Sequence, residues 1–178
     1  MLKKERRNKM QAIVFTSNTG HTQEYAQMLG VELGLPCYDL KQAKSNLPSG
    51  AEIVYLGWIM AGNVQGLKKA LRRYDVKAVC AVGMSGNSDQ LKEMYDKYRF
   101  LEDTPLFYLQ GGLEYQKLKG VYKFMIGTIK NVMGKKLEAK EEKSQEEQEM
   151  LDLIVNGRST VSKEKLSDVL AYLKENVI

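Results

Sequence analysis

Short runs of apolar residues alternate along the chain with longer segments in which apolar residues recur every three or four positions. Between the short runs, helical spacing occurs in 25–33 (Tyr25, Ala26, Leu29 and Leu33), in 67–74 and in 91–98. The short apolar runs are 12–15, 37–40, 53–56, 78–82 and 106–109. Strands that alternate with helices are typical of βαβ units on a parallel sheet. The pattern therefore predicts an α/β fold with five parallel strands and helices on both faces.

The same spacing predicts which side chains of the later helices face the core. These are Leu67, Ala70, Leu71 and Tyr74, then Leu91, Met94, Tyr95 and Tyr98, and finally Leu166, Val169, Leu170, Leu173 and Val177. We expect Gly34 and Pro36 to end the first helix. A later helix should begin at Asn87 or Ser88, with Gln90 placed for a capping box, and the last helix should begin at Ser162.

An insertion interrupts this order after the fifth predicted strand. Roughly fifty residues separate that strand from the last helix, where about 2–6 would suffice. Leu118, Tyr122, Met125, Ile129 and Val132 have helical spacing, which predicts an amphipathic helix with a lysine-rich outer side. The acidic stretch 138–152 should form a second, solvent-facing helix. We therefore expect one domain over 11–178, with an insertion at about 113–160, preceded by a basic leader over 1–10.

Charge and cysteine content narrow the class of protein. The 178 residues include 27 Lys and Arg, 22 Asp and Glu, one His and two Cys, which fits a single domain. Four of the five net positive charges fall in 1–10, which is interpreted as a flexible tail or as an upstream start preceding Met10. No apolar run reaches the roughly 18–20 residues of a membrane span or resembles a signal peptide. Cys37 and Cys80 predict neither a disulfide nor a metal site, so we expect a cytoplasmic protein.

A polar loop follows the first predicted strand and runs directly into a helix. It consists of Thr16, Ser17, Asn18, Thr19, Gly20, His21 and Thr22. A helix N-terminus leaves about four N–H groups unpaired and carries roughly half a positive charge, so it suits a phosphate without any Lys or Arg. The loop therefore predicts a phosphate site. The alternative is a loop that only caps its helix.

Other phosphate-binding motifs do not fit this chain. Gly134, Lys135 and Lys136 lack the hydroxyl and the earlier glycine of a nucleoside-triphosphate loop. The dinucleotide fingerprint is missing after the first strand, and Gly86 stands where a low-molecular-weight phosphatase would need an Arg after Cys80. No Asp ends the third strand, as a phosphoacceptor receiver would require. The single-glycine hydroxyl loop is the one that remains.

The loop Thr16 to Thr22 resembles the Thr/Ser-x-Thr-Gly-x-Thr phosphate loop by which the flavodoxin family holds FMN, and the element order from Gln11 to Gln110 is similar too. The resemblance implies FMN as cofactor and a flavodoxin-like parallel sheet of order 2-1-3-4-5. It also implies that two further loops hold the isoalloxazine ring, with Trp58 either stacked beside it or packed in the core. These loops are Gly57, Trp58, Ile59, Met60, Ala61 and Gly62, and then Gly83, Met84, Ser85, Gly86 and Asn87.

Two segments after the fifth strand are similar to one branch of this family, the quinone-dependent protoporphyrinogen dehydrogenases. They are 110–115 (Gln-Gly-Gly-Leu-Glu-Tyr) and 122–126 (Tyr-Lys-Phe-Met-Ile). The resemblance implies a flavoprotein oxidoreductase with a quinone or another redox partner and a tetrapyrrole substrate. Two alternatives stay open, namely an electron-transfer carrier without its own substrate and a binding module that has lost the cofactor.

The two predicted flavin loops contain no charged residue from Gly57 to Gly66 or from Gly83 to Ser88. Two-electron reduced flavin is an anion, so neighbouring carboxylates would lower its potential. Single-electron carriers of the family are acidic there, as the resemblance implies, so we expect a higher potential and two-electron chemistry. No side chain is predicted to be catalytic, because the flavin would carry the reaction. His21 is the only His and should donate a hydrogen bond or face solvent, which disfavours hydrolase chemistry.

The lysine-rich helix of the insertion, over 117–136, allows two interpretations. Its apolar side can cover the domain while its lysines, including Lys119, Lys123 and Lys130, stay solvated. Alternatively it can contact an anionic membrane surface peripherally, or the propionates of a tetrapyrrole. Nucleic acid is not an expected partner, because the basic segment adjoins an acidic one and lacks interleaved aromatic residues.

Overall fold

A five-stranded parallel sheet forms the centre of the computed structural model, which describes residues 10–84, 88–101, 103–118 and 120–176. Its order is β2-β1-β3-β5-β6. The strands are β1 (Ala12–Thr16), β2 (Cys37–Asp39), β3 (Glu52–Met60), β5 (Asp75–Gly83) and β6 (Leu106–Gln110). A short strand, β4 (Asn63–Val64), pairs antiparallel with the end of β3. The predicted α/β class and strand order are therefore confirmed.

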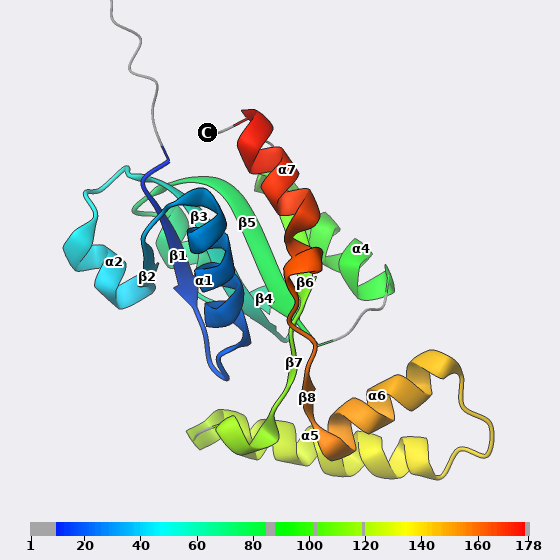
Figure 1. Cartoon of the computed structure of the whole chain (residues 1–178). Helices are drawn as coiled ribbons and strands as arrows, with labels where there is room; N and C mark the ends of the chain where they lie inside the picture. The colour runs from blue at the N-terminus through cyan, green and yellow to red at the C-terminus, as the bar shows by residue number, and fades with distance from the viewer. Residues whose placement is uncertain (1–9, 85–87, 102, 119, 177–178) are drawn as a thin grey trace, which may run out of the picture.

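Helices cover both faces of this sheet. Figure 1 shows α1 (His21–Leu33) and α7 (Ser167–Asn176) in front of it. The other face packs against α2 (Leu40–Asn46), α3 (Leu67–Leu71) and α4 (Ser88–Lys97). Strand side chains alternate between the two faces, so Ile13 and Phe15 join the α1–α7 core while Val14 joins the other. We call this sheet with its five helices the body.

Local signals explain several helix ends. Gly34 ends α1 at φ +64 with its N–H bonded to Gly30 O, as predicted. Asp39 caps α2 by accepting from the N–H groups of Lys41 and Gln42, in a capping box. The apolar pattern does not predict α2, because it places Leu40 in the second strand. Its cap shows that the chain turns helical directly after Asp39.

The predicted inner faces are largely confirmed, with one error in α4. Met94 and Tyr98 are buried, but Tyr95 is 47% exposed, so the helix presents a narrower apolar face than the spacing suggested. Before α7, a short 3-10 helix, η3 (Lys163–Leu166), follows Ser162. Leu166, Val169 and Leu173 are buried and Leu170 is partly buried against the same core, as predicted. Asn87, Val177 and the side chains of Gln90 and Leu91 lie outside what the structure describes.

The insertion forms a helical hairpin, α5 (Gly120–Glu138) and α6 (Gln145–Asn156), carried by a two-stranded antiparallel ribbon. The ribbon pairs β7 (Gly112–Leu113) with β8 (Arg158–Ser159), and η2 (Tyr115–Lys117) links β7 to α5. Figure 1 places the hairpin beyond the carboxyl ends of the sheet strands. A second helix is present, but it spans 145–156 rather than 138–152, because Glu138 belongs to α5 and the capping box of Ser144 and Glu147 begins α6.

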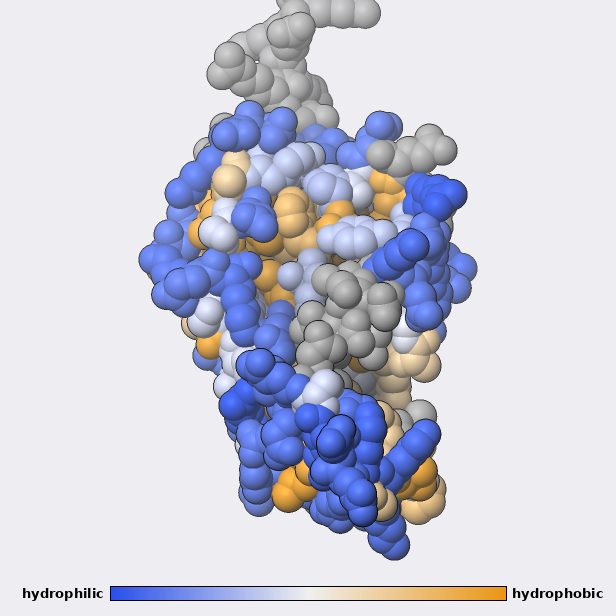
Figure 2. Space-filling view, turned by 90° about the vertical axis from the view of Figure 1, so that its right-hand side faces the viewer, coloured by the Kyte–Doolittle hydropathy of each residue, from blue (hydrophilic) through white to orange (hydrophobic). Residues whose placement is uncertain are grey.

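The apolar stripe predicted for the first inserted helix is wrong in two places. Leu118 is buried but precedes α5, and Val132 is 63% exposed. The side chains of Tyr122, Met125 and Ile129 lie outside the described part of the chain. Figure 2 shows apolar atoms among hydrophilic ones over the hairpin, at the bottom of the view. Within the described residues, no helix combines the length and the apolar character that crossing a membrane requires.

Candidate cofactor site

The loop after β1 leaves the start of α1 without a side-chain cap. Gly20 is the N-cap residue, at φ +103, and provides no side-chain cap for the helix. Ser17 Oγ instead accepts from Gly20 N at 3.1 Å, within the loop itself. The first-turn N–H groups have no partner in the helix and can bind an anion. This geometry suits an anion, and the alternative that the loop only caps its helix stays open.

Asn18 gives a second indication that this loop binds a ligand. Its Nδ2 atom is buried and has no hydrogen-bond partner among the described residues. Leaving such a donor unsatisfied costs about 1–3 kcal/mol. Together with the uncapped helix, this donor makes the loop a site of N–H groups without a carboxylate, which fits a phosphate group. The residues present therefore suit the phosphate of FMN.

Thr16 ties this loop to β3 and to the start of α3. Its Oγ1 lies 2.7 Å from Tyr55 Oη, and Tyr55 Oη donates to Gln65 O at 2.6 Å. Because the tyrosine proton goes to Gln65 O, Thr16 must donate to the tyrosine oxygen. Gly66, at φ +80, lies so close that an added Cβ would overlap Tyr55 Oη and Thr16 Oγ1. Thr16 therefore positions the loop, because its proton is used within the protein.

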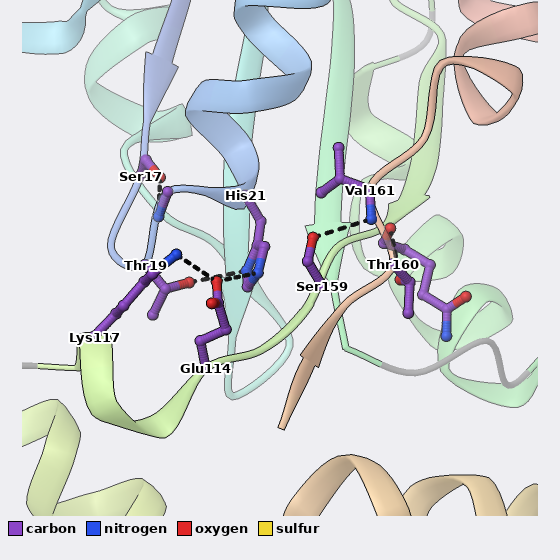
Figure 3. A network of polar contacts seen from close by, with 10 residues as sticks. Ser17, Thr19, His21, Glu114, Lys117, Ser159, Thr160 and Val161 are labelled. Carbon is purple, nitrogen blue, oxygen red and sulfur yellow. Dashed lines mark hydrogen bonds and ion pairs between the residues drawn. The ribbon is translucent and has the colours of Figure 1, made fainter. Parts of the chain in front are cut away.

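His21 is buried at the foot of the inserted ribbon. Its side chain is 5% exposed, and Nδ1 lies 3.0 Å from Thr19 Oγ1. Its Nε2 lies 3.0 Å from Glu114 Oε2, and Lys117 Nζ is 2.8 Å from the same oxygen (Figure 3). The Nε2 contact is close but lacks the alignment of a hydrogen bond. Of the two roles expected for His21, a hydrogen bond or exposure to solvent, its burial excludes the second. Glu114 and His21 are 93 positions apart, so spacing could not reveal this pair.

Burial and charge set the protonation of this cluster. Burial lowers the pKa of His21 below its ordinary value of 6.5, even though Glu114 acts in the opposite direction. The hydrogen bond from Lys117 is the main cause that lowers the pKa of Glu114, with His21 contributing less. His21 is therefore neutral at pH 7 and acts as a spacer between the loop and the ribbon. Gly111 permits this approach, because a Cβ there would lie 3.1 Å from His21 Cβ.

The first predicted flavin loop is largely strand. Gly57, Trp58, Ile59 and Met60 belong to β3, which continues to Met60 because Ile59 and Met60 pair with Val64 and Asn63 of β4. The turn consists of Ala61 at φ +47 and Gly62 at φ +67, as in a type I′ hairpin. Placing Gly57 to Met60 in a loop was wrong. The register still aligns Thr16 with Gly57 at the carboxyl edge, and Trp58 with Val82.

The second predicted flavin loop is described only at its start. Gly83 ends β5, and a Cβ there would come within 2.6 Å of Tyr108 Oη. Met84 O accepts a hydrogen bond from Gln110 Nε2 at 3.3 Å. The side chain of Met84 packs against the small core of the hairpin. Ser85, Gly86 and Asn87 lie outside the described residues. The described ends of β1, β3 and β5 therefore meet at one edge, beneath the inserted hairpin.

Comparison with known proteins agrees with this geometry. A family model described as a flavodoxin domain matches residues 12–140, from β1 through α5. Neither the curated proteins nor the solved structures gave a match. The match covers most of the chain and includes the sheet, the loop after β1 and the first inserted helix. Domains of this kind typically bind FMN in redox reactions. The chain belongs to the flavodoxin family.

Proposed function

We propose that this protein binds FMN with its phosphate on the loop 17–22 and acts as an FMN-dependent oxidoreductase. The observation that carries the proposal is the buried, unpartnered Asn18 amide beside the uncapped start of α1. FMN supplies electron-transfer chemistry that amino-acid side chains lack. The chain's own part is to hold the phosphate on main-chain N–H groups, with Trp58, Gly83 and Met84 at the adjoining strand ends.

A flavin titration tests this proposal. FMN should quench Trp58 fluorescence and bind at least tenfold more tightly than riboflavin, which lacks the phosphate. Asn18→Ala should weaken FMN binding by about 1.5–3 kcal/mol, the value of a hydrogen bond to a charged group, and should leave riboflavin binding unchanged. Asn176→Ala is the matched control, because Asn176 is exposed in α7 and donates to Tyr172 O. Equal affinity for the two flavins, or no binding of either, would refute the proposal.

The charges around the site favour a two-electron enzyme over a carrier. Residues 57–66 carry no charge, and Lys97 Nζ lies 3.7 Å from the place where a Cβ at Gly62 would be. Glu114 is compensated by Lys117 at 2.8 Å. A net positive surrounding favours the reduced anionic flavin by Coulomb attraction. Redox titration should give a reduction potential above that of carriers with acidic loops, and Lys97→Gln should lower this potential. A potential as low as that of carriers with acidic loops would favour the carrier alternative.

Protoporphyrinogen with a quinone acceptor is the specific reaction that we propose. The segments that resemble this branch lie at 110–115, which leads from β6 into the ribbon, and at 122–126, in α5. The carrier alternative predicts electron transfer from a reductase to an acceptor with no turnover of its own. Protoporphyrinogen with menaquinone should therefore react rapidly, whereas a reduced-nicotinamide reductase system should not. The opposite pattern would assign the protein to the carriers.

Helix α5 also supports a peripheral contact with an anionic membrane, where quinones reside. Phe124 is 78% exposed and Val121 is 63% exposed, while Lys135 and Lys136 remain on the exposed surface. Exposed apolar side chains beside lysines suit the interface of anionic lipid. Lys130 is less available than the sequence suggested, because its Nζ donates to Val155 O and lies 5.4 Å from the Tyr115 ring centroid.

Co-sedimentation with phosphatidylglycerol vesicles tests this contact. Phe124→Ser should reduce the bound fraction severalfold, since it removes an exposed apolar side chain worth about 1.5–3 kcal/mol on burial. Val31→Ser is the control, because Val31 is 81% exposed on α1 of the body. Equal losses in the two variants, or binding unaffected by Phe124→Ser, would exclude a membrane contact through α5.

A further inference from the structure

A cleft of about 640 Å³ adjoins the loop after β1. Its walls come from residues 16–18, from Trp58 of β3, and from α2 and the segment 65–74 that contains α3. Lys41 and Lys44 line it from α2, and Lys69 and Arg73 line it from the opposite wall. Its volume is that of a small-molecule site, which is typically about 300–1,000 Å³. The apolar pattern does not predict this cleft, because it does not predict α2.

The lining of this cleft carries four cations and no acid. Lys41, Lys44 and Lys69 form no ion pair with any described residue. Asp39, the N-cap residue of α2, accepts hydrogen bonds from the N–H groups of Lys41 and Gln42. Lys41, Lys44 and Lys69 are exposed at the rim of the cleft, where like charges lining a concave surface attract anions. The cleft is therefore electrostatically unbalanced in the protein alone.

The side chain of Arg73 is held in place by hydrogen bonds within the protein. Its Nη2 donates to Lys44 O at 3.1 Å, and its Nε donates to Tyr74 Oη at 3.2 Å. The guanidinium also lies 5.6 Å from the centroid of the Tyr74 ring. A cation held in this way loses little side-chain freedom when it binds an anion. Lys41 and Lys44 from α2 and Lys69 from α3 can contact the same ligand.

We propose that this cleft binds a small phosphorylated molecule with at least two negative charges, adjacent to the flavin. The proposal rests on the proposed function in one respect, that FMN fills the loop after β1. The FMN phosphate is served by the N-terminus of α1, so four further cations exceed what one phosphate needs. Trp58, which the proposed function places beside the flavin, belongs to the same lining, so the two ligands would adjoin each other. Such a ligand would be an electron donor or an acceptor for the flavin.

Calorimetric titration of inorganic pyrophosphate into the FMN-loaded chain tests the proposal. Lys41→Gln with Lys69→Gln should weaken binding at least tenfold and leave FMN affinity unchanged. The matched control is Lys135→Gln with Lys136→Gln, which removes the same charge from α5 and should change nothing. Equal weakening in the two double variants would show a diffuse charge effect and overturn the proposal. Binding of polyglutamate without binding of pyrophosphate would assign the cleft to an acidic protein, and would overturn it too.

A parallel titration without FMN separates the two proposals. Pyrophosphate that binds only in the absence of FMN enters the loop after β1, so the cleft proposal fails while the FMN proposal stands. If the protein takes up no FMN, the proposed function fails and the cleft is judged on the free chain with Asn18→Ala. Pyrophosphate binding that depends on Lys41 and Lys69 but not on Asn18 would still support the cleft. The reverse dependence would refute it.

Discussion

The body and the inserted hairpin bury their apolar residues to very different extents. In the body, both faces of the sheet are covered, and side chains such as Leu56, Tyr55 and Leu29 are fully buried. In the hairpin, the small core of described residues centres on Leu113, Leu118 and Leu153, while large apolar side chains of α5 stay exposed. Burial of apolar area is the main stabilising contribution to a fold. The body can therefore fold on its own core, and the hairpin depends on its attachment.

That attachment is strongest where the ribbon leaves the sheet. Thr160 N donates to Gly111 O at 2.9 Å, and Tyr25 Oη donates to Gln110 O at 2.7 Å. The contact between Glu114 and His21 lies at the same level, next to the candidate phosphate loop. Beyond it, the ribbon links the hairpin to the body (Figure 1), and the side chain of Met84, after β5, packs against the hairpin core. The hairpin is therefore a surface feature over the candidate site, fixed where the ribbon leaves the sheet and exposed on its outer side.

Truncation of one leucine in each region should give the largest contrast. Leu56→Ala in the centre of the sheet should lower the free energy of unfolding by about 3–5 kcal/mol, because the cavity is enclosed on all sides. Leu153→Ala should leave the denaturant midpoint of the body almost unchanged and raise hydrogen exchange in α5 and α6 alone. Guanidinium unfolding and exchange measurements check both. If both variants lowered the denaturant midpoint of the body, the two regions would unfold as one unit.

Two glycines with positive φ provide a second contrast. Gly66→Ala should cost about 2–3 kcal/mol, because the backbone penalty of about 1–2 kcal/mol adds to overlap with Tyr55 and Thr16. Gly120→Ala, at φ +56 with nothing within 4 Å of an added Cβ, should cost only the backbone penalty. Thermal unfolding measures both costs. FMN affinity should fall in the first variant alone, and equal costs would show that the contacts of Gly66 can relax.

The pH dependence of stability should report on the root of the hairpin. Because burial lowers the pKa of His21 below 6.5, its stabilising contribution is complete above 6.5 and is lost as the pH falls from there toward the folded-state pKa. The lowered pKa of Glu114 acts separately, below its ordinary value of 4.5. Unfolding free energies measured between pH 7 and pH 5 should therefore fall less steeply in His21→Gln than in the unaltered chain. Parallel curves would contradict the burial of a neutral imidazole.

The sequence predicted the body well because its strands are continuous apolar runs and its helices keep one apolar stripe. It failed at Leu40, where a capping aspartate outweighed an apolar run that resembled a strand. It also failed at Ile59 and Met60, because pairing with β4 lengthens β3 and only the turn at Ala61 and Gly62 remains a loop. Local pairing and capping decide such boundaries, and an apolar run alone does not determine them.

The candidate site shows the same limit at longer range. The loop after β1 could be predicted because its polar residues, its glycine and the following helix are contiguous. The contact between His21 and Glu114 could not, because it depends on the direction in which the ribbon leaves β6. The basic cleft was missed because Lys41 and Lys69 come from elements that meet only in the folded chain. Contacts between distant segments follow from topology, which periodicity in one segment does not contain.

Removal of the hairpin should have the smallest effect on the body. Replacing 114–157 by Asn-Gly would join Leu113 to Arg158, residues that already pair across the ribbon, through a two-residue turn. Loss of the contact between Glu114 and His21 lowers stability, whereas the shorter connection costs less entropy to close. The free energy of unfolding of the body should therefore change by less than about 1 kcal/mol. FMN affinity should persist while vesicle binding disappears. A stable body that no longer binds FMN would show instead that the insertion completes the cofactor site, since only its residues would have been removed.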